Sequence, residues 1–309
     1  MRICSLLPSS TEILYGLGLD DQIVAVTHEC DFPPDALIKP KVTRSEITPS
    51  LSSAEIDFQV RRQLENAGSL YELNVQLLDE LKPDIIFTQQ LCTVCAVSYE
   101  NVYRVANTLS SKPRVINLEP KSLDGIFENI LEVGGLTGVT DRAVSLVHGL
   151  QQRVERVRQL TMHMGRRKLL FLEWLDPPFC AGHWNPELIE IAGGYDALSC
   201  KFLPAHQLAW EQILSYNPES IVVSCCGCSV ERTLQDIHLL QLPQLQDMSA
   251  IRNGNVFVVD GSAYFSRPGT RIIDSLEILA TIVHPELFPF DYPESIVYHV
   301  KDSELIQSP

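Results

Sequence analysis

Short apolar runs alternate with longer amphipathic stretches along the whole chain. The apolar runs predict strands at 2–7, 22–27, 84–88 and 114–118 in the first half and at 168–174, 220–224 and 256–260 in the second. Between them, apolar residues at helical spacing predict helices at 10–18, 72–82, 99–110, 122–135, 186–192, 207–216, 231–241 and 269–283. The strands are apolar throughout, which is typical of a parallel sheet covered by helices on both faces. The pattern therefore predicts an α/β fold built from βα repeats.

Two of the predicted helices begin with recognisable capping sequences. "SSTE" reads as a capping box, with Ser9 as the N-cap and Glu12 at the third helical position. "NPELIEIAGG" predicts Asn185 as an N-cap, Pro186 as the first helical residue and the two glycines as the stop. Because these helices follow strands directly, the intervening loops lie at the carboxyl ends of strands, where open α/β sheets bind ligands.

One long amphipathic helix is predicted in the middle of the chain, in "TDRAVSLVHGLQQRVERVRQLTMHMG". Val147, Leu150, Val154 and Val157 form a one-sided apolar stripe at helical spacing. A rigid helix joining two α/β lobes would limit how far they open, whereas the alternative is a surface helix of one larger domain. The predicted division is an N-terminal lobe at 1–138, a connecting helix at 139–165 and a C-terminal lobe at 166–309.

Length and charge narrow the functional classes. A chain of 309 residues is long enough for two hydrophobic cores. The formal net charge of −15 argues against binding nucleic acid or an anionic membrane surface. No apolar run reaches the roughly 18 residues of a membrane span. The opening "MRICSLLPSSTE" lacks an apolar run of the about 7–15 residues found in secretory signals, so we expect a cytoplasmic location.

Two distant segments follow the same plan. "LLDELKPDIIFTQQLCTVC" and "WEQILSYNPESIVVSCCGCSVE" each contain a helical run, a proline with an acidic residue, an apolar strand and clustered cysteines. The two lobes are therefore predicted to use one supersecondary unit at equivalent places. If the lobes face each other, both thiol clusters open into one cleft.

The nine cysteines are an odd number without a secretory context, which argues against a disulfide framework. Taken singly, Cys4, Cys30, Cys180 and Cys200 are interpreted as small buried hydrophobes. Two C-x-x-C pairs are different, because together they would complete a four-thiolate zinc site or hold an iron–sulfur cluster. Thiols that only line a ligand cleft, or that are inert and buried, are the alternatives. The candidate metal ligands are Cys92, Cys95, Cys225 and Cys228.

Several segments resemble a known family over nearly the whole chain: "SLLPSSTEILYGLGLDDQIVAVTHECDFP", "LKPDII", "LTGVTDRAVSLV", "WNPELIEIAGG" and "NGNVFVVDGSAYFSRPGTRIIDSLEILATIVHP". With two βα lobes and one connecting helix, they resemble the periplasmic-binding-protein fold of the iron-siderophore, haem and cobalamin type, most of all its cobalamin-binding branch. The resemblance implies two Rossmann-like lobes and a non-catalytic protein that captures cobalamin, or a related corrinoid or tetrapyrrole, in the cleft between them. A protein that binds a metal or an iron–sulfur cluster across the same cleft is the alternative.

The resemblance also implies a partner, because family members dock on an ABC permease through one exposed glutamate on each lobe. Glu211 in "AWEQIL" matches the second of these positions. The first-lobe position is Gln76, with Glu72 and Glu80 a few residues away. Together with the lack of an export signal, this departure favours a cytoplasmic binding protein, sensor or carrier.

The loops after the strands supply candidate ligand contacts. A flat tetrapyrrole needs broad aromatic contact with a few polar anchors, and neutral imidazole can ligate cobalt or iron. Arginines near a helix start suit amide or phosphate groups. The alternatives are core packing for the tryptophans, hydrogen bonding for the histidines and salt bridges for the arginines. The candidate ligand-binding residues are His28, Arg44, Trp174, His183, Trp184, Tyr264, Phe265 and Arg267, with Glu46 and Arg271 as further anchors.

Catalytic motifs are missing from the sequence. It contains no G-x-S-x-G, P-loop, H-E-x-x-H, or G-x-G-x-x-G after a strand. Glu173 and Asp176 are paired carboxylates in one predicted loop, but nothing in the sequence names a substrate for them. We therefore predict that the chain is not an enzyme.

Overall fold

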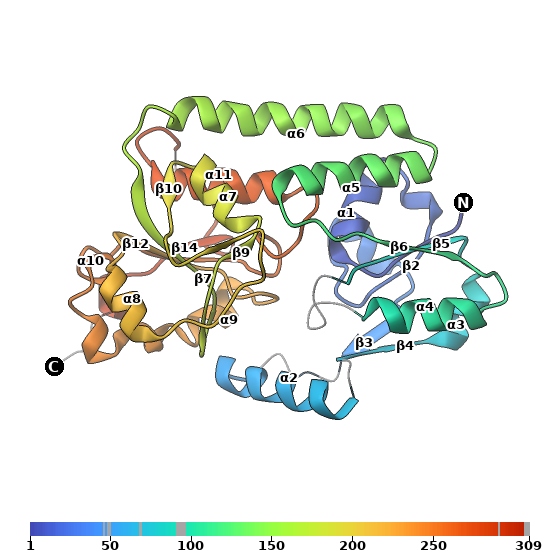
Figure 1. Cartoon of the computed structure of the whole chain (residues 1–309), viewed down its shortest axis with the longest axis horizontal. Helices are drawn as coiled ribbons and strands as arrows, with labels where there is room; N and C mark the ends of the chain where they lie inside the picture. The colour runs from blue at the N-terminus through green and yellow to red at the C-terminus, as the bar shows by residue number, and fades with distance from the viewer. Residues whose placement is uncertain (46, 48–50, 68–69, 91–96, 290, 306–309) are drawn as a thin grey trace.

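The computed structural model describes residues 1–309 except 46, 48–50, 68–69, 91–96, 290 and 306–309. It has two lobes, each built around its own sheet, with one long helix along one side of both (Figure 1). This is the predicted α/β architecture of two βα lobes joined by a helix. No helix within the described ranges has both the length and the apolar character needed to cross a membrane.

The first lobe contains a four-stranded sheet in the order β2-β1-β5-β6, with every pair parallel. Its strands are β1 (Ile3–Ser5), β2 (Ile23–Val26), β5 (Ile85–Thr88) and β6 (Arg114–Asn117). Its helices are α1 (Pro8–Gly16), α3 (Val75–Leu81), α4 (Tyr99–Thr108) and α5 (Leu123–Leu136). A separate antiparallel pair joins β3 (Thr43–Ser45) to β4 (Tyr71–Leu73). All four strands predicted for the first half are confirmed.

The second lobe has a sheet in the order β10-β7-β12-β13-β14, with β8 paired to β7. Its strands are β7 (Arg167–Leu175), β8 (Pro178–Cys180), β10 (Gly194–Tyr195), β12 (Ser220–Val223), β13 (Val256–Val259) and β14 (Val297–His299). A short parallel pair joins β9 (Gly182–His183) to β11 (Cys200–Lys201). The helices are α7 (Asn185–Ile191), α8 (Trp210–Tyr216), α9 (Val230–Leu234), α10 (Ser249–Arg252), α11 (Ile272–Val283) and α12 (Asp302–Leu305). The predicted helix at 231–241 is instead α9 followed by a 3₁₀ turn at Ile237–Gln241, and the three predicted strands are confirmed.

The repeated supersecondary unit predicted from the sequence is present in both lobes. Helices α3 and α8 each end at a residue in the left-handed conformation, Lys82 (φ 44°) and Asn217 (φ 45°). A proline follows each of these residues, and the chain then enters the parallel strands β5 and β12. The two lobes therefore present equivalent helices before equivalent strands.

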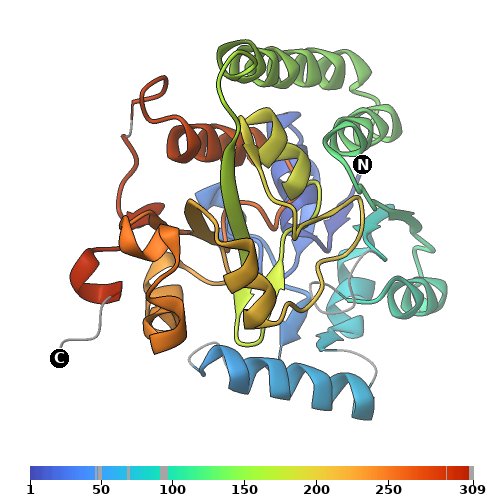
Figure 2. The ribbon, with the colours of Figure 1, turned by 60° about the vertical axis from the view of Figure 1, so that its left-hand side comes forward.

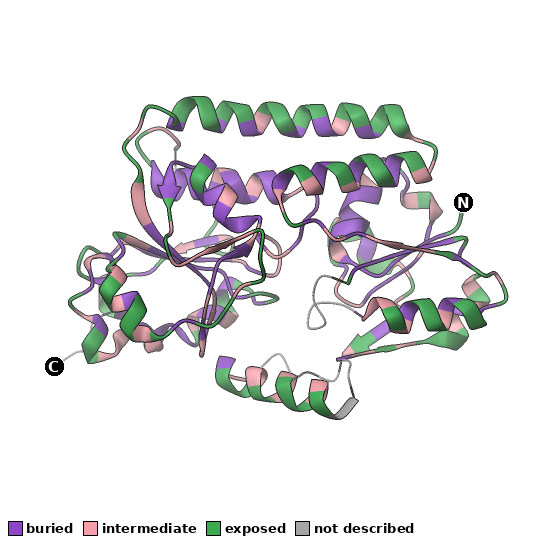
Figure 3. Cartoon of the chain, in the orientation of Figure 1, coloured by how far each residue is buried: buried purple, intermediate pink, exposed green. Residues whose placement is uncertain are grey.

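The predicted connecting helix is α6 (Thr140–Thr161), which runs along one side of both lobes (Figure 1). Its valine and leucine stripe is buried against α5 of the first lobe and against α7 and α11 of the second, while its outer face is exposed (Figure 3). Arg153 on α6 donates to Asp274 at 2.5 Å and to Glu277 at 2.7 Å, both on α11. Packing on both lobes makes α6 a rigid brace rather than a flexible linker.

The capping box predicted for α1 is wrong. The helix begins at Pro8 with Leu7 as its N-cap, so Ser9 lies inside the first turn. Glu12 turns away from the helix start because its carboxylate is paired with Arg271 of the second lobe. The Glu12 side chain, which the local pattern assigned to a helix cap, therefore forms a tertiary ion pair instead.

Helix α2 (Ser53–Ala67) was not predicted. It lies between β3 and β4 in the sequence and, in space, on the side of the two lobes opposite α6 (Figures 1 and 2). Its start carries a local signal, since the Ser52 backbone N–H and hydroxyl both donate to the Glu55 carboxylate, at 2.9 and 2.7 Å. The Ser-x-x-Glu spacing of a capping box would have located it.

Candidate functional site

A half-buried glutamate, Glu173, fixes the segment that carries His183. The Gly182 N–H and the Asn185 side-chain amide both donate to Glu173 Oε1, each at 2.8 Å. Asn185 is therefore not the N-cap that the sequence predicted; Trp184 occupies that position, without a side-chain cap. Glu173 acts as a loop anchor here, because the two donors lie on either side of His183 and Trp184.

His183 is half-buried and lies between the lobes. Its backbone has a positive φ of 52°, and its Nδ1 has no hydrogen-bond partner among the described residues. Burial lowers the pKa of His183, Lys121 lowers it further, and Glu119 acts in the opposite sense. Both of these charges follow β6, so the ring faces the first lobe. A lowered pKa keeps the imidazole neutral, which is the form that ligates metals.

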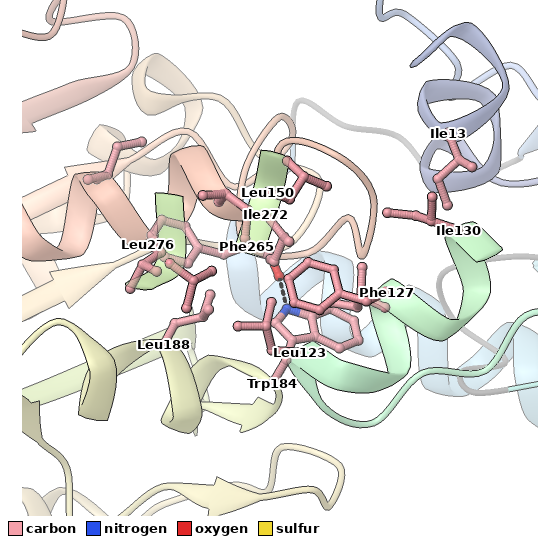
Figure 4. Packing of buried hydrophobic residues seen from close by; sticks show 14 of the residues in the cluster. Ile13, Leu123, Phe127, Ile130, Leu150, Trp184, Leu188, Phe265, Ile272 and Leu276 are labelled. Carbon is pink, nitrogen blue, oxygen red and sulfur yellow. Dashed lines mark hydrogen bonds between the residues drawn. The ribbon is translucent and has the colours of Figure 1, made fainter. Parts of the chain in front are cut away.

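Trp184 and Phe265 belong to a buried core that joins the lobes. The Trp184 indole is 4% exposed and donates to the Phe265 carbonyl at 2.8 Å. Leu123 and Phe127 of α5 pack beside the indole (Figure 4). Phe265 is 1% exposed and lies 5.0 Å from the Phe171 ring. The burial of Trp184 favours core packing over ligand contact. A direct ligand contact by Trp184 or Phe265 stays a prediction.

Trp174 connects the second lobe to α2. Its indole N–H is shared between the Asp176 carbonyl at 3.1 Å and the Ser53 carbonyl at 3.3 Å, and its ring is partly exposed. The Asp236 carboxylate accepts from the N–H and the hydroxyl of Ser53, while Arg232 donates to the Leu51 carbonyl. The amino-terminal end of α2 is thus fastened to the second lobe although the helix belongs to the first.

His28 follows β2 and faces the β3–β4 pair. Its Nδ1 lies 2.7 Å from Thr43 Oγ1, its Nε2 lies 3.1 Å from the Glu29 carboxylate, and its ring centroid is 5.5 Å from that of Tyr71. The nearby Arg44 is exposed, and its Nε and Nη2 both donate to Glu72 Oε2. Glu46, predicted as a further anchor, lies outside the described residues.

Arg267 and Arg271 are engaged across the lobe boundary. Arg271 donates twice to Glu12, at 2.6 and 3.1 Å. Arg267 pairs with Asp31 and lies 3.7 Å from Glu12. Tyr264 stands beside this network, with the Arg271 guanidinium 5.5 Å from its ring centroid. The salt-bridge alternative is what the structure shows for both arginines, and their contact with a ligand stays a prediction.

The predicted thiol site is described only in part. Cys92 and Cys95 lie outside the described residues. Cys225 and Cys228 are buried in the apolar cluster of the second lobe, whereas Cys226 is exposed. Burial raises the pKa of Cys228 to about 12, so its thiol is protonated at neutral pH. A metal held by the four cysteines stays a prediction.

The predicted docking positions lie on the equivalent helices of the two lobes. Glu211 is exposed in the first turn of α8. Gln76 is exposed on α3, and its amide donates to Glu80 at 3.1 Å. Glu72 is not on this helix and is already paired with Arg44.

The raised pKa of Glu173 makes the free energy of unfolding depend on pH. Burial raises its pKa above the ordinary value of 4.5, so the folded chain holds this proton more tightly than the unfolded chain. Its contribution to stability is therefore fully present below pH 4.5 and is lost as the pH rises through the folded pKa. We expect Glu173→Gln, which keeps the Oε1 acceptor, to flatten the dependence of the unfolding free energy on pH. Urea unfolding between about pH 5 and about pH 8 measures this.

Glu173→Ala is the matched comparison for that experiment. It removes the acceptor for Gly182 and Asn185 and should cost about 1–3 kcal/mol at every pH. A Glu173→Gln variant that is much less stable than the parent at about pH 8 would show that the loop needs the charged carboxylate.

Comparisons with known proteins agree with this geometry. Residues 3–263 match the family described as periplasmic binding protein. A vitamin B12-binding protein of Vibrio cholerae serotype O1 is 24% identical over 284 residues, covering 91% of this chain and 88% of the relative. The crystal structure of a periplasmic vitamin B12 binding protein of Vibrio cholerae gives a TM-score of 0.68 at 23% identity, covering 92% of this chain and 96% of that one. A periplasmic heme-binding protein of Pseudomonas aeruginosa gives 0.72 at 18% identity, covering 96% of both chains.

These matches identify the protein family and contradict the predicted location. The cytoplasmic location expected from the first residues is not supported and conflicts with a family whose members are periplasmic. The predicted absence of catalysis agrees with the family, which consists of small-molecule-binding components of ABC transporters. Because the match spans most of its length, the chain belongs to the periplasmic binding protein family.

Proposed function

We propose that this chain binds cobalamin, or a related corrinoid or tetrapyrrole, between its two lobes and does no chemistry on it. The names of its relatives support a ligand of this class. The observation that carries the proposal is His183: a half-buried imidazole, kept neutral by burial, whose Nδ1 has no partner among the described residues. This nitrogen is buried in the present structure, so a lobe movement must uncover it; once uncovered, a neutral imidazole is suited to ligate the metal of a corrin or haem ring.

The residues around His183 suit a large flat ligand. Trp174, near the end of β7, and Tyr264, in the loop after β13, are partly exposed aromatic rings of the second lobe, and His28 is partly exposed on the first. Aromatic rings supply large apolar contact area, and a few polar groups then fix the orientation. Trp184 lies behind His183 with ring centroids 5.5 Å apart, so it holds the imidazole in place from the core.

The brace and helix α2 determine how the ligand enters. Helix α6 packs on both lobes, and the core around Trp184 joins them, so wide opening at this side would expose buried apolar surface. On the opposite side, α2 spans the lobes through contacts at its amino-terminal end. Capture then involves small lobe movements and the release and return of the α2 contacts.

Spectral titration tests the proposal. We expect purified chain to shift the visible spectrum of hydroxocobalamin, cyanocobalamin or haemin at micromolar concentration. His183→Ala should weaken this uptake by about tenfold or more, which corresponds to about 1.4 kcal/mol. His148→Ala, an exposed histidine on the outer face of α6, is the matched control and should bind as the parent does.

The outcomes separate two claims. If none of the three compounds binds, the proposed function is wrong. If one binds equally well to the His183→Ala variant, capture stands and His183 is not a ligand.

We also propose that delivery, where it occurs, uses the two equivalent helices. Glu211 on α8 is exposed, and its carboxylate has no hydrogen bond or ion pair with any residue that the structure describes. On α3 the corresponding surface offers Glu80, held by Gln76, rather than a free glutamate. An ABC permease that docks here would therefore meet one strong acidic contact and one weaker one.

A further inference from the structure

Three ligating side chains from separate segments meet at one edge of the second lobe. The Sγ atoms of Cys180 and Cys200 are 3.8 Å apart. His206 Nδ1 lies 3.2 Å from the first sulfur and 2.7 Å from the second. Cys180 ends β8, Cys200 begins β11, and His206 precedes α8. The prediction that Cys200 is a buried hydrophobe is wrong, because it is partly exposed and its sulfur faces an imidazole.

The backbone fixes the separation of the three groups. The Cys180 N–H donates to the His206 carbonyl at 3.0 Å, and the His206 N–H lies 3.4 Å from the Cys180 sulfur. The Cys200 N–H donates to the Ala181 carbonyl at 2.8 Å. Gly182 lies against the backbone of Ala205, where an added Cβ would come within 2.4 Å of the amide nitrogen. The cluster is therefore held by main-chain pairing and not by the thiols themselves.

We propose that Cys180, Cys200 and His206 form a binding site for one zinc(II) ion, with a fourth position open to solvent. Tetrahedral zinc with ordinary bond lengths places two sulfurs about 3.8 Å apart and a sulfur and a nitrogen about 3.6 Å apart. The two sulfurs already lie 3.8 Å apart, as such a site requires. Cys180 Sγ and His206 Nδ1, at 3.2 Å, are slightly closer than the required sulfur–nitrogen distance. The imidazole must move away from Cys180 by about 0.4 Å and from Cys200 by about 0.9 Å, and both His206 and Cys200 are at the accessible side of the cluster.

The burial of the three groups suits a site that fills from solvent. Cys180 is fully buried, Cys200 is intermediate and His206 is exposed, so an ion can enter past the imidazole. Within the described part of the chain, no fourth histidine, cysteine or carboxylate joins the group. Two thiolates and one imidazole are soft and borderline ligands that favour zinc over magnesium or calcium, and binding releases the two thiol protons to solvent.

The site also lies beside the proposed ligand pocket. Strand β11 pairs with β9 in parallel, with Cys200 opposite Gly182 and Lys201 opposite His183. An ion bound at Cys200 would fix the strand that neighbours His183. The metal site stands on its own contacts, so it does not depend on what the lobes capture.

Cobalt(II) substitution tests the site. The full chain is reduced, treated with chelator without oxygen, and titrated with cobalt(II), then with zinc(II). We expect one equivalent of cobalt to give a thiolate charge-transfer band with tetrahedral ligand-field bands, and zinc to displace it. His206→Ala and Cys200→Ser should each weaken cobalt binding by more than about tenfold. Both replace accessible side chains, so the far-ultraviolet circular dichroism should match that of the parent.

Matched variants make the outcome decisive. Cys226→Ser, at the exposed cysteine outside the cluster, should bind cobalt as the parent does. The proposal is overturned if the reduced chain gives no charge-transfer band, or if the band survives His206→Ala and is lost in Cys228→Ser. It is also overturned if mass spectrometry finds a Cys180–Cys200 disulfide and the protein still binds no cobalt after reduction. Failure of corrinoid or haem uptake leaves each of these readings unchanged.

Discussion

Replacing Glu12 with alanine should lower the free energy of unfolding by about 3–5 kcal/mol. The Glu12 side chain is 1% exposed and accepts two hydrogen bonds from Arg271, with Arg267 3.7 Å away. Burial raises the pKa of Glu12, while both guanidiniums act in the opposite direction. The substitution leaves the Arg271 side chain, 12% exposed, without its carboxylate partner in a low-dielectric setting, whereas Arg267 keeps Asp31.

Urea unfolding of three variants separates charge from packing. Glu12→Ala/Arg271→Met removes the cation that lost its partner and should recover part of the loss. Glu132→Ala, at an exposed glutamate on α5, is the control and should change stability by less than about 0.5 kcal/mol. A loss below about 1 kcal/mol for Glu12→Ala would show that the ion network between the lobes contributes little to stability.

The positions of the strands could be predicted because buried parallel strands are apolar along their whole length. The run "IVVS" predicts β12 from its composition alone, without any knowledge of its neighbours in space. The connecting helix is likewise predicted by its one-sided apolar stripe. Helix α2 is as polar and as amphipathic as α6, so weak contrast between its faces does not explain why the apolar pattern missed it; among its described side chains only Ser53 is buried. Its capping box was the better signal.

The candidate site was harder to predict because its contacts are not local. Glu12 and Arg271 are separated by 259 residues, and local spacing assigned Glu12 to a helix cap instead. Sequence patterns placed Trp174 and Trp184 in one loop but could not tell which ring faces the core. The cluster of Cys180, Cys200 and His206 has no recognisable spacing, since three separate strand and loop ends bring it together.

Trp174, which the structure places in β7, and Trp184, at the start of α7, should respond differently to truncation. Trp184→Ala removes a buried indole that packs between the lobes and donates to Phe265, and it should cost about 3–5 kcal/mol of stability. Trp174→Ala removes a partly exposed ring with one bond to α2. We expect a smaller loss of stability and a weakening of corrinoid or haem uptake by about tenfold or more, because the ring is placed where a ligand can meet it.

Conservative variants make this contrast a test of the binding face. Trp184→Phe keeps most of the packing and loses only the donor to the Phe265 carbonyl, so its cost should fall to about 1–3 kcal/mol. Trp174→Phe keeps an aromatic surface and should retain most of the uptake, which a purely structural role of the indole N–H on Ser53 would not allow. If Trp184→Phe loses the ligand while Trp174→Ala keeps it, the ligand lies against the core between the lobes, and the outer wall formed with α2 is not the binding face.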